Sequence, residues 1–228
     1  MSTIPADTDL GLQESGFGNH LTPVLYLDLF SGAGGDMLLG ALIDLGLALE
    51  DLRADLARMA LSGYELEAER QVRHGLSGTQ LRVRDVAQEH PARHLHDVRR
   101  LIKESTLSEP VKEISIAVFE RLARAEARVH GVSVDEIHFH ELGAVDSLVD
   151  VVGFAVGLER LGVARVFSSP VPLGSGTIQT EHGLLPVPAP ATLALLAEAG
   201  APTCPHPAQT EIVTPTAAAL LAQLATFA

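Results

Sequence analysis

The chain has 228 residues, enough for one large domain or two small ones, and a chain of this size can bury roughly 70% of its unfolded surface. Hydrophobic residues make up 46% of it and charged residues 20%, which is an ordinary globular composition. The net charge of −13 opposes binding to a nucleic-acid backbone, so nucleic acid is excluded as a partner. Residues 53–134 hold 14 of the 16 basic groups, so the acidic flanking segments should attract cations.

Cysteine content and the N-terminal region limit the chemistry and the location. The single cysteine, Cys204, excludes an intramolecular disulfide and any site built from several thiolates, so a bound metal would need imidazole and carboxylate ligands. The first basic residue is Arg53, so the positive stretch of a secretory signal is missing. No uninterrupted apolar run reaches about 18 residues. These features predict a cytoplasmic protein with no membrane partner.

The first third of the chain predicts two buried elements and a hairpin. Residues 24–30 form an apolar run that is typical of a buried strand and ends at a glycine-rich stretch. Apolar residues recur at helical spacing over residues 37–47, where Gly46 marks the end of a helix. Residues 64–70 and 79–86 alternate between apolar and polar types, which predicts two antiparallel strands.

The remainder predicts helices separated by strands and turns. Helical periodicity occurs in residues 97–105, 111–130, 146–161, 191–199 and 217–224. Residues 133–140 are interpreted as a turn or short strand, residues 163–173 as a strand, and residues 170–190 as a rigid, turn-rich segment. This order favours an α/β or α+β fold in which helices pack on a mixed sheet.

A glycine-rich loop joins the first strand to the first helix. Backbone amides in such a loop bind anions, so Ser31, Gly32, Gly34 and Gly35 are candidates for holding a substrate phosphate. Asp36 follows the loop, and an acid beside an anion site usually indicates a bridging divalent cation. The alternative is a tight turn whose glycines serve packing alone.

A second group of residues has the composition of a metal site. If residues 138–140 are extended, His138 and His140 project to the same face, close to Glu141 and Asp146. Imidazole and carboxylate ligands suit Ni, Zn, Mn or Fe. The alternative is that one histidine caps a helix and the other is satisfied in the core. Asp150 lies one helical turn beyond Asp146.

Other histidines carry weaker signals. His90, His94 and His96 form a loose cluster, for which a solvated helix start is favoured over a weak metal site. His182 is a lone imidazole in a loop rich in Pro and Gly, where a site role and a structural role are equally favoured. Cys204 has no neighbouring base in sequence and is interpreted as a plain packing or surface thiol.

Residues 27–35 resemble two families. The sequence of this segment is similar to the S-adenosylmethionine-binding loop of DNA cytosine methyltransferases, so a methyltransferase is one alternative. The nucleophilic cysteine of those enzymes follows a proline, whereas Cys204 precedes Pro205. The net charge of −13 also disfavours a DNA substrate.

The second family resembles the chain from about Val24 to Leu221. It is the LarC family, the nickel insertion proteins of the nickel-pincer cofactor pathway. Ordered motifs carry this resemblance: residues 26–37, Arg93-His94-Leu95 with Asp97, His138-Phe-His-Glu-Leu-Gly-Ala-Val-Asp146-Ser147, Pro172-Leu-Gly-Ser-Gly176, residues 182–192 and Thr214-Pro-Thr216.

The resemblance implies a nickel chelatase of the lyase class. Such a protein places Ni(II) into pyridinium-3,5-bisthiocarboxylic acid mononucleotide, which gives the cofactor of lactate racemase, and it depends on CTP with Mn(II) or Mg(II). The nickel ligands would come from the acids and histidines at positions 36, 138, 140, 141 and 146. Since the metal replaces a proton, a base is needed, and His182 is the candidate.

The resemblance also implies a domain plan. Residues 1–22 are expected to be a disordered leader, and residues 23–228 the N-terminal nickel-insertion domain. The C-terminal domain that the family associates with CTP is absent from this chain, so activity would need a C-terminal domain or chain as partner. A non-enzymatic subunit that holds nickel for assembly is a further alternative, and a homo-oligomer is also left open.

Overall fold

The computed structural model describes residues 23–86, 93–139, 145–180 and 183–228. The predicted leader over residues 1–22 lies outside them. Helices and strands are both plentiful, so the predicted α/β class is confirmed. Parallel and antiparallel pairs both occur, but they lie in separate small sheets rather than in one mixed sheet.

A three-stranded parallel sheet forms the base of the molecule. Its order is β1 (Val24–Leu27), β6 (Arg165–Ser168) and β11 (Ala225–Phe227), with β6 in the centre. Leu25 and Leu27 alternate with exposed neighbours and are buried, as expected for a sheet with one covered face.

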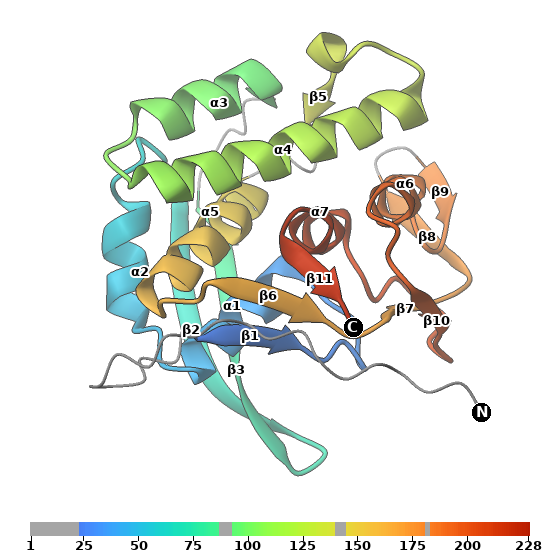
Figure 1. Cartoon of the computed structure of the whole chain (residues 1–228), viewed down its shortest axis with the longest axis horizontal. Helices are drawn as coiled ribbons and strands as arrows, with labels where there is room; N and C mark the ends of the chain where they lie inside the picture. Colours follow the sequence, from blue (N-terminus) through green and yellow to red (C-terminus); the bar gives the residue numbers. More distant parts are fainter. Residues whose placement is uncertain (1–22, 87–92, 140–144, 181–182) are drawn as a thin grey trace, which may run out of the picture.

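Helices cover one side of this sheet. They are α1 (Gly35–Asp44), α2 (Leu49–Leu56), α3 (Leu95–Glu104), α4 (Glu109–His130), α5 (Val145–Arg160), α6 (Pro190–Glu198) and α7 (Pro215–Leu224). Helix α4 crosses over α5 and α7, and the sheet lies beneath them (Figure 1). In the described part of the chain, no helix combines the length and apolar character needed to cross a bilayer.

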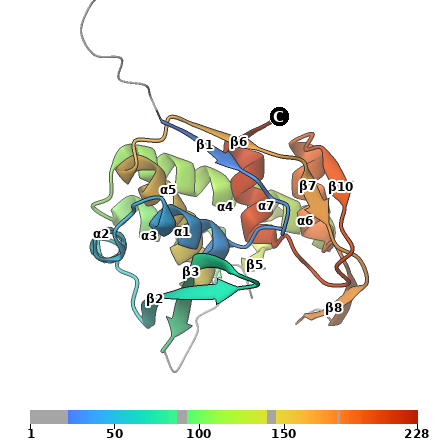
Figure 2. The ribbon, with the colours of Figure 1, turned by 90° about the horizontal axis from the view of Figure 1, so that it is seen from below.

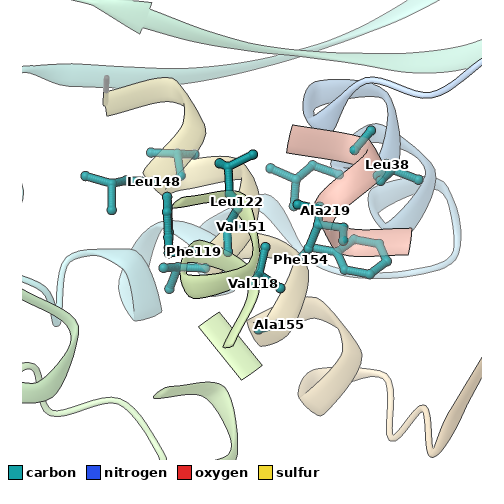
Figure 3. Packing of buried hydrophobic residues seen from close by; sticks show 14 of the residues in the cluster. Leu38, Val118, Phe119, Leu122, Leu148, Val151, Phe154, Ala155 and Ala219 are labelled. Carbon is teal, nitrogen blue, oxygen red and sulfur yellow. The ribbon is translucent and has the colours of Figure 1, made fainter. Parts of the chain in front are cut away.

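The core fills the space between α1, α4, α5 and α7 (Figure 3). Phe119 of α4 and Phe154 of α5 are the largest of its fully buried side chains. Helix α5 is buried on nearly every side, which fixes the position of its N-terminal end relative to α1 and α7. A close-packed interior of this kind resists displacement of its elements.

A long hairpin extends from the body. Strands β2 (Tyr64–Arg73) and β3 (Leu76–Asp85) pair in antiparallel register, as predicted, and turn at His74 and Gly75 (Figures 1 and 2). Leu66 and Leu81 on its inner face are buried against the helices.

Two predictions for the remaining segments are corrected. The single strand expected over residues 163–173 is two strands, β6 and β7 (Val171–Leu173), because Pro170 carries no N–H and the chain changes its pairing partner to β10 (Thr203–Pro205). The turn-rich segment contains a hairpin of β8 (Thr177–Thr180) and β9 (Gly183–Pro186).

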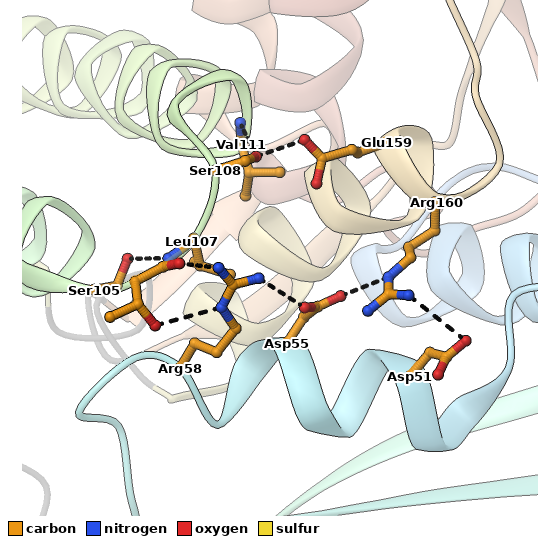
Figure 4. Close-up of polar contacts among 10 residues, drawn as sticks. Asp51, Asp55, Arg58, Ser105, Leu107, Ser108, Val111, Glu159 and Arg160 are labelled. Carbon is orange, nitrogen blue, oxygen red and sulfur yellow. Dashed lines mark hydrogen bonds and ion pairs between the residues drawn. The ribbon is translucent and has the colours of Figure 1, made fainter.

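A polar network ties α2 to α5 (Figure 4). Buried Asp55 accepts a hydrogen bond from Arg160 Nε at 2.8 Å and another from Arg58 Nη1 at 3.1 Å. Burial raises the pKa of Asp55, but the hydrogen bonds from Arg160 and Arg58 lower it more, so the pKa falls below its usual value. The network therefore holds an ionised carboxylate between two helices.

Candidate functional site

The starts of three helices meet at one cavity of about 500 Å³. The helices are α1, α5 and α7, and the fourth wall is strand β3. The cavity is lined by Gly35, Asp36, Leu81, Arg82, Val83, Arg84, Asp146, Ser147, Asp150, Glu211, Thr214, Pro215 and Thr216. Helix N-termini carry partial positive charge, so their meeting favours oxygen-rich and negatively charged groups there.

The glycine loop is bonded to the segment that leads into α7. The amide of Ala33 donates to the carbonyl of Ile212 at 2.7 Å, and the amide of Thr214 donates to the carbonyl of Ala33 at 3.1 Å. Gly32 has φ +93°, and a Cβ placed there would lie 2.0 Å from the Ile212 oxygen. Only glycine therefore allows this close approach.

The amides expected to hold phosphate differ in their bonding. The Gly32 amide donates to the Leu29 carbonyl at 2.7 Å within a turn. Gly34 and Gly35 lie at the start of α1, where amides have no acceptor inside the helix. Asp36 Oδ1 accepts from the Met37 amide at 2.8 Å, so a carboxylate already lies over this helix end. The phosphate cradle stays a prediction.

Asp150 lies against the start of α1. A Cβ on Gly35 would be 2.0 Å from Asp150 Oδ2, so glycine makes room for this carboxyl group. Asp150 Oδ1 is buried and has no hydrogen-bond partner among the described residues. Burial, and then repulsion from Asp146 and Asp36, raise the pKa of Asp150 to about 8.

Asp146 lines the cavity at the start of α5. Its Oδ1 accepts from the Ser147 amide at 2.8 Å, which lowers its pKa, but desolvation by the cavity walls outweighs this and raises the pKa above its usual value. The carboxylates of Asp85 and Asp36 raise it further. The carboxylate of Asp36 thus raises the pKa of both Asp146 and Asp150.

The histidine motifs meet beside α3 rather than within the described cavity lining. Strand β4 (Arg93–His94) pairs with β5 (His138–Phe139), and His94 lies opposite His138 in the register. His94 is the N-cap residue of α3, and its amide donates to Asp97 Oδ2 at 3.2 Å, which agrees with the polar helix start predicted there. Its Nδ1 lies 3.1 Å from the Ile137 carbonyl, and its ring stacks on His96.

Several predicted site residues lie outside what the structure describes. These are His90, His140, Glu141 and His182, together with the side chain of His138. Among the described residues, no group of three His, Cys, Asp or Glu side chains is arranged to hold a metal ion. The cavity lining that is described contains no histidine. The assignment of metal ligands therefore remains a prediction.

The cavity also contains residues that sequence reasoning missed. Arg82 and Arg84 alternate with apolar residues on a strand, and nothing in that pattern marks them as site residues. Thr216 is buried, and its Oγ1 lies 3.5 Å from Ser147 Oγ. The sequence singled out Thr214-Pro-Thr216 as part of the family resemblance, but it did not predict that Thr216 lies at this cavity.

Comparison with known proteins shows the family of this chain. The family described as "Nickel insertion protein" matches residues 25–228. The chain belongs to the nickel insertion protein family. No solved structure shows significant similarity to it.

Curated relatives of the nickel insertion family are close in sequence. A protein of Syntrophobacter fumaroxidans named for nickel insertion is 54% identical over 200 residues, which cover 88% of this chain and 50% of that protein. The pyridinium-3,5-bisthiocarboxylic acid mononucleotide nickel insertion protein of Desulfitobacterium hafniense DCB-2 is 48% identical over 196 residues, covering 86% and 48% respectively. The chain thus spans about half the length of these curated relatives.

Residues of the segment rich in proline and glycine pack next to the stretch that leads into α7. Pro172, Gly174 and Pro188 line a small hollow together with residues 211–213, the segment that leads to α7. A Cβ on Gly174 would lie 2.1 Å from the Thr210 carbonyl oxygen. These residues therefore support residues 211–213, the same segment to which the glycine loop is hydrogen-bonded.

Proposed function

We propose that this chain is the N-terminal, nickel-inserting portion of an enzyme that places Ni(II) into pyridinium-3,5-bisthiocarboxylic acid mononucleotide. The observation that carries the proposal is the meeting of the last residue of the glycine loop, Gly35, with the Asp146-Ser147 motif and the Thr214-Pro-Thr216 motif around one cavity, in a chain of the nickel insertion family. The product would serve lactate racemase maturation. The reaction would take place in the cytoplasm.

Nickel is a substrate in this proposal, and oxygen and imidazole ligands suit it. Asp36 and Asp146 supply carboxylates at the cavity. We assign the remaining ligands to His138, His140 and Glu141, since a chain of five residues joins β5 to α5 and keeps the two motifs close. The phosphate of the substrate would bind at Ser31, Gly32, Gly34 and Gly35.

Insertion of nickel requires protons to leave, because metal ligands must be deprotonated. Desolvation, and then the carboxylates of Asp85 and Asp36, raise the pKa of Asp146, so its ionised form is disfavoured without a cation nearby. A divalent cation reverses this preference. His182 is proposed as the base that accepts a proton from the substrate.

The proposal includes a partner. Because the chain spans about half the length of its curated relatives, we assign CTP, with Mn(II) or Mg(II), to a C-terminal domain or chain that acts together with residues 23–228. If the chain binds nickel alone but forms product only after the C-terminal domain or chain is added, this assignment of nickel and CTP to separate parts is supported.

Calorimetric titration with Ni(II) tests the assignment of ligands. We expect His138→Ala, His140→Ala and Asp146→Asn each to weaken nickel binding at least about tenfold, the loss typical for a ligand or its support. Asp135→Asn, a change of exposed charge on the 3-10 helix Val134–Glu136, should leave the affinity unchanged. Unchanged affinity in all three site variants would reject the proposed ligands.

Adding the C-terminal half, CTP and Mn(II) then separates enzyme from carrier. The chelatase proposal expects nickel to appear in the mononucleotide, followed by absorbance and mass spectrometry. Tight nickel binding without product under these conditions would instead identify a subunit that only holds nickel.

A further inference from the structure

The charges of the cavity and of the expected ligand do not match by themselves. The molecule named for the Desulfitobacterium relative is a mononucleotide with two thiocarboxylic acid groups, so it is strongly anionic. The cavity is lined by the acids Asp36, Asp146, Asp150 and Glu211, within a chain of net charge −13. An anionic ligand would be repelled unless cationic groups faced it.

Two arginines meet this need. Among the described residues that line the cavity, Arg82 and Arg84 are the only cationic side chains. The geometry points to these two residues of β3 as the binding groups for the phosphate of a pyridinium mononucleotide. This inference rests on the proposed function and names the residues that make that site select a phosphorylated substrate.

The strand that carries the arginines is fixed onto the helix that begins at the glycine loop. Asp44 near the end of α1 accepts from the Thr79 amide at 2.9 Å and from Thr79 Oγ1 at 2.7 Å. A Cβ on Gly40 would lie 2.4 Å from the Thr79 carbonyl oxygen, so α1 and β3 are in backbone contact. Buried Leu81 completes the attachment. The next residues of β3 are therefore held at the cavity.

Both arginines form ion pairs with glutamates of β2, and a bound phosphate could replace these glutamates as the partner. Arg84 contacts Glu67 at 2.6 Å and Arg82 contacts Glu69 at 3.6 Å. The four side chains are 45% to 63% exposed, and exposed ion pairs of this kind contribute little to stability. A phosphate offers stronger, bidentate hydrogen bonds to a guanidinium group. Turning toward the cavity would thus cost little.

The cavity then has two chemically different sides. The carboxylates at the starts of α1 and α5 would attract a cation, and the arginines of β3, once turned from Glu67 and Glu69 toward the cavity, would attract an anion. The amides at the start of α1 lie in the same cavity and can share the phosphate. A ligand that carries both a metal ion and a phosphate fits both sides.

Calorimetry with metal-free pyridinium ligands tests the inference. The probes are nicotinic acid mononucleotide and nicotinic acid riboside, which differ in the phosphate alone. We expect the wild-type chain to bind the mononucleotide at least about tenfold more tightly than the riboside. The double variant Arg82→Gln/Arg84→Gln should lose this difference and leave riboside affinity unchanged. Arg73→Gln, on the same hairpin but outside the cavity, should behave as wild type.

Other results would overturn the inference. Equal binding of both probes by the wild type, or no binding of either, would show that no phosphate is recognised here. An equal loss of affinity for both probes in the double variant would show that the substitutions damage the cavity. The single variants Arg82→Gln and Arg84→Gln would then decide: a loss of affinity for the mononucleotide alone would support the inference, and an equal loss for both probes would overturn it. Nickel titration of the same variants is expected to be unchanged, so failure here is separate from failure of the nickel proposal.

Discussion

At the scale of single residues, the site depends on contacts that side chains would prevent. Gly35 allows Asp150 to approach the start of α1, and Gly32 allows the Ile212 carbonyl to approach the loop. In both cases the added Cβ would lie 2.0 Å from an oxygen atom. The carboxyl group of Asp150 is thereby enclosed without a hydrogen-bond partner for Oδ1 among the described residues.

The enclosed carboxyl group predicts a dependence of stability on pH. Its pKa is raised from 3.8 to about 8, so between these values the folded chain keeps a proton that the unfolded chain has lost. The stability contributed by neutral Asp150 is full below pH about 4 and is lost as the pH rises toward 8. Asp150→Asn should therefore gain stability relative to wild type across this window, by at most about 1.4 kcal/mol per pH unit.

Urea unfolding at several pH values measures this difference. The variant and the wild type should differ least below pH about 4, where wild-type Asp150 is neutral in both states. Asp44→Asn is the control of opposite sign, because hydrogen bonds from Thr79 lower the pKa of Asp44. A constant difference between Asp150→Asn and wild type at every pH would show that the pKa of Asp150 is the same in the folded and the unfolded chain, which would contradict its raised value.

The glycine loop predicts a matched pair of substitutions. Gly32→Ala combines a φ of +93° with a Cβ 2.0 Å from the Ile212 oxygen, whereas Gly46→Ala has a φ of +113° and no atom within 4 Å. Strain alone costs about 1–2 kcal/mol. We expect Gly32→Ala to lose about 2 kcal/mol more than Gly46→Ala in thermal unfolding, since it also breaks the contact with Ile212. Equal losses would mean that the contact contributes nothing.

At the scale of elements, the starts of α1, α5 and α7 must stay in place for the cavity to exist. Helix α5 is held at its other end by the bond between Arg160 and Asp55 of α2 (Figure 4). Helix α4 is held to α6 by the ion pair of Arg121 with Glu198 at 2.9 Å. Polar contacts thus hold the C-terminal ends of α5 and α6, while the core holds the helices along their buried faces.

The contact between α2 and α5 predicts a loss of stability in Asp55→Asn of about 2 kcal/mol. The change removes the charge from two hydrogen bonds and leaves Arg58 and Arg160 without their buried partner. Urea unfolding at pH 7 measures it. Asp51→Asn is the control, because Asp51 is 57% exposed and lies 3.9 Å from Arg160, so it should change stability by less than about 0.5 kcal/mol. A similar loss in both would contradict the role of Asp55.

Periodicity predicted the elements that have clear boundaries. Pro110 and Gly131 mark the two ends of α4, which the structure places at Glu109–His130. Helix α2 was missed because its eight residues are too few to show a periodic pattern. Strand β11 was missed because it is three residues long and depends on pairing with β6, a contact distant in sequence. Short strands are specified by their partners more than by their own residues.

At the scale of the whole molecule, the cavity joins parts of the chain that are distant in sequence. Gly35, Asp36 and Asp146 were singled out from local patterns, and the structure places these three at the cavity, whereas Ser31, Gly32 and Gly34 do not line it. Arg82, Arg84 and Glu211 could not be predicted, because only tertiary packing brings a hairpin strand and the segment before α7 to the same place. A chain of net charge −13 thus has two cationic side chains among the residues that line this cavity.

The most direct measurement is an anomalous difference map at the nickel absorption edge, from crystals grown with Ni(II) and the pyridinium mononucleotide. Our account predicts nickel in the cavity beside Asp36 and Asp146, with the phosphate toward Arg82 and Arg84. Nickel bound elsewhere, with this cavity holding neither metal nor mononucleotide, would contradict it.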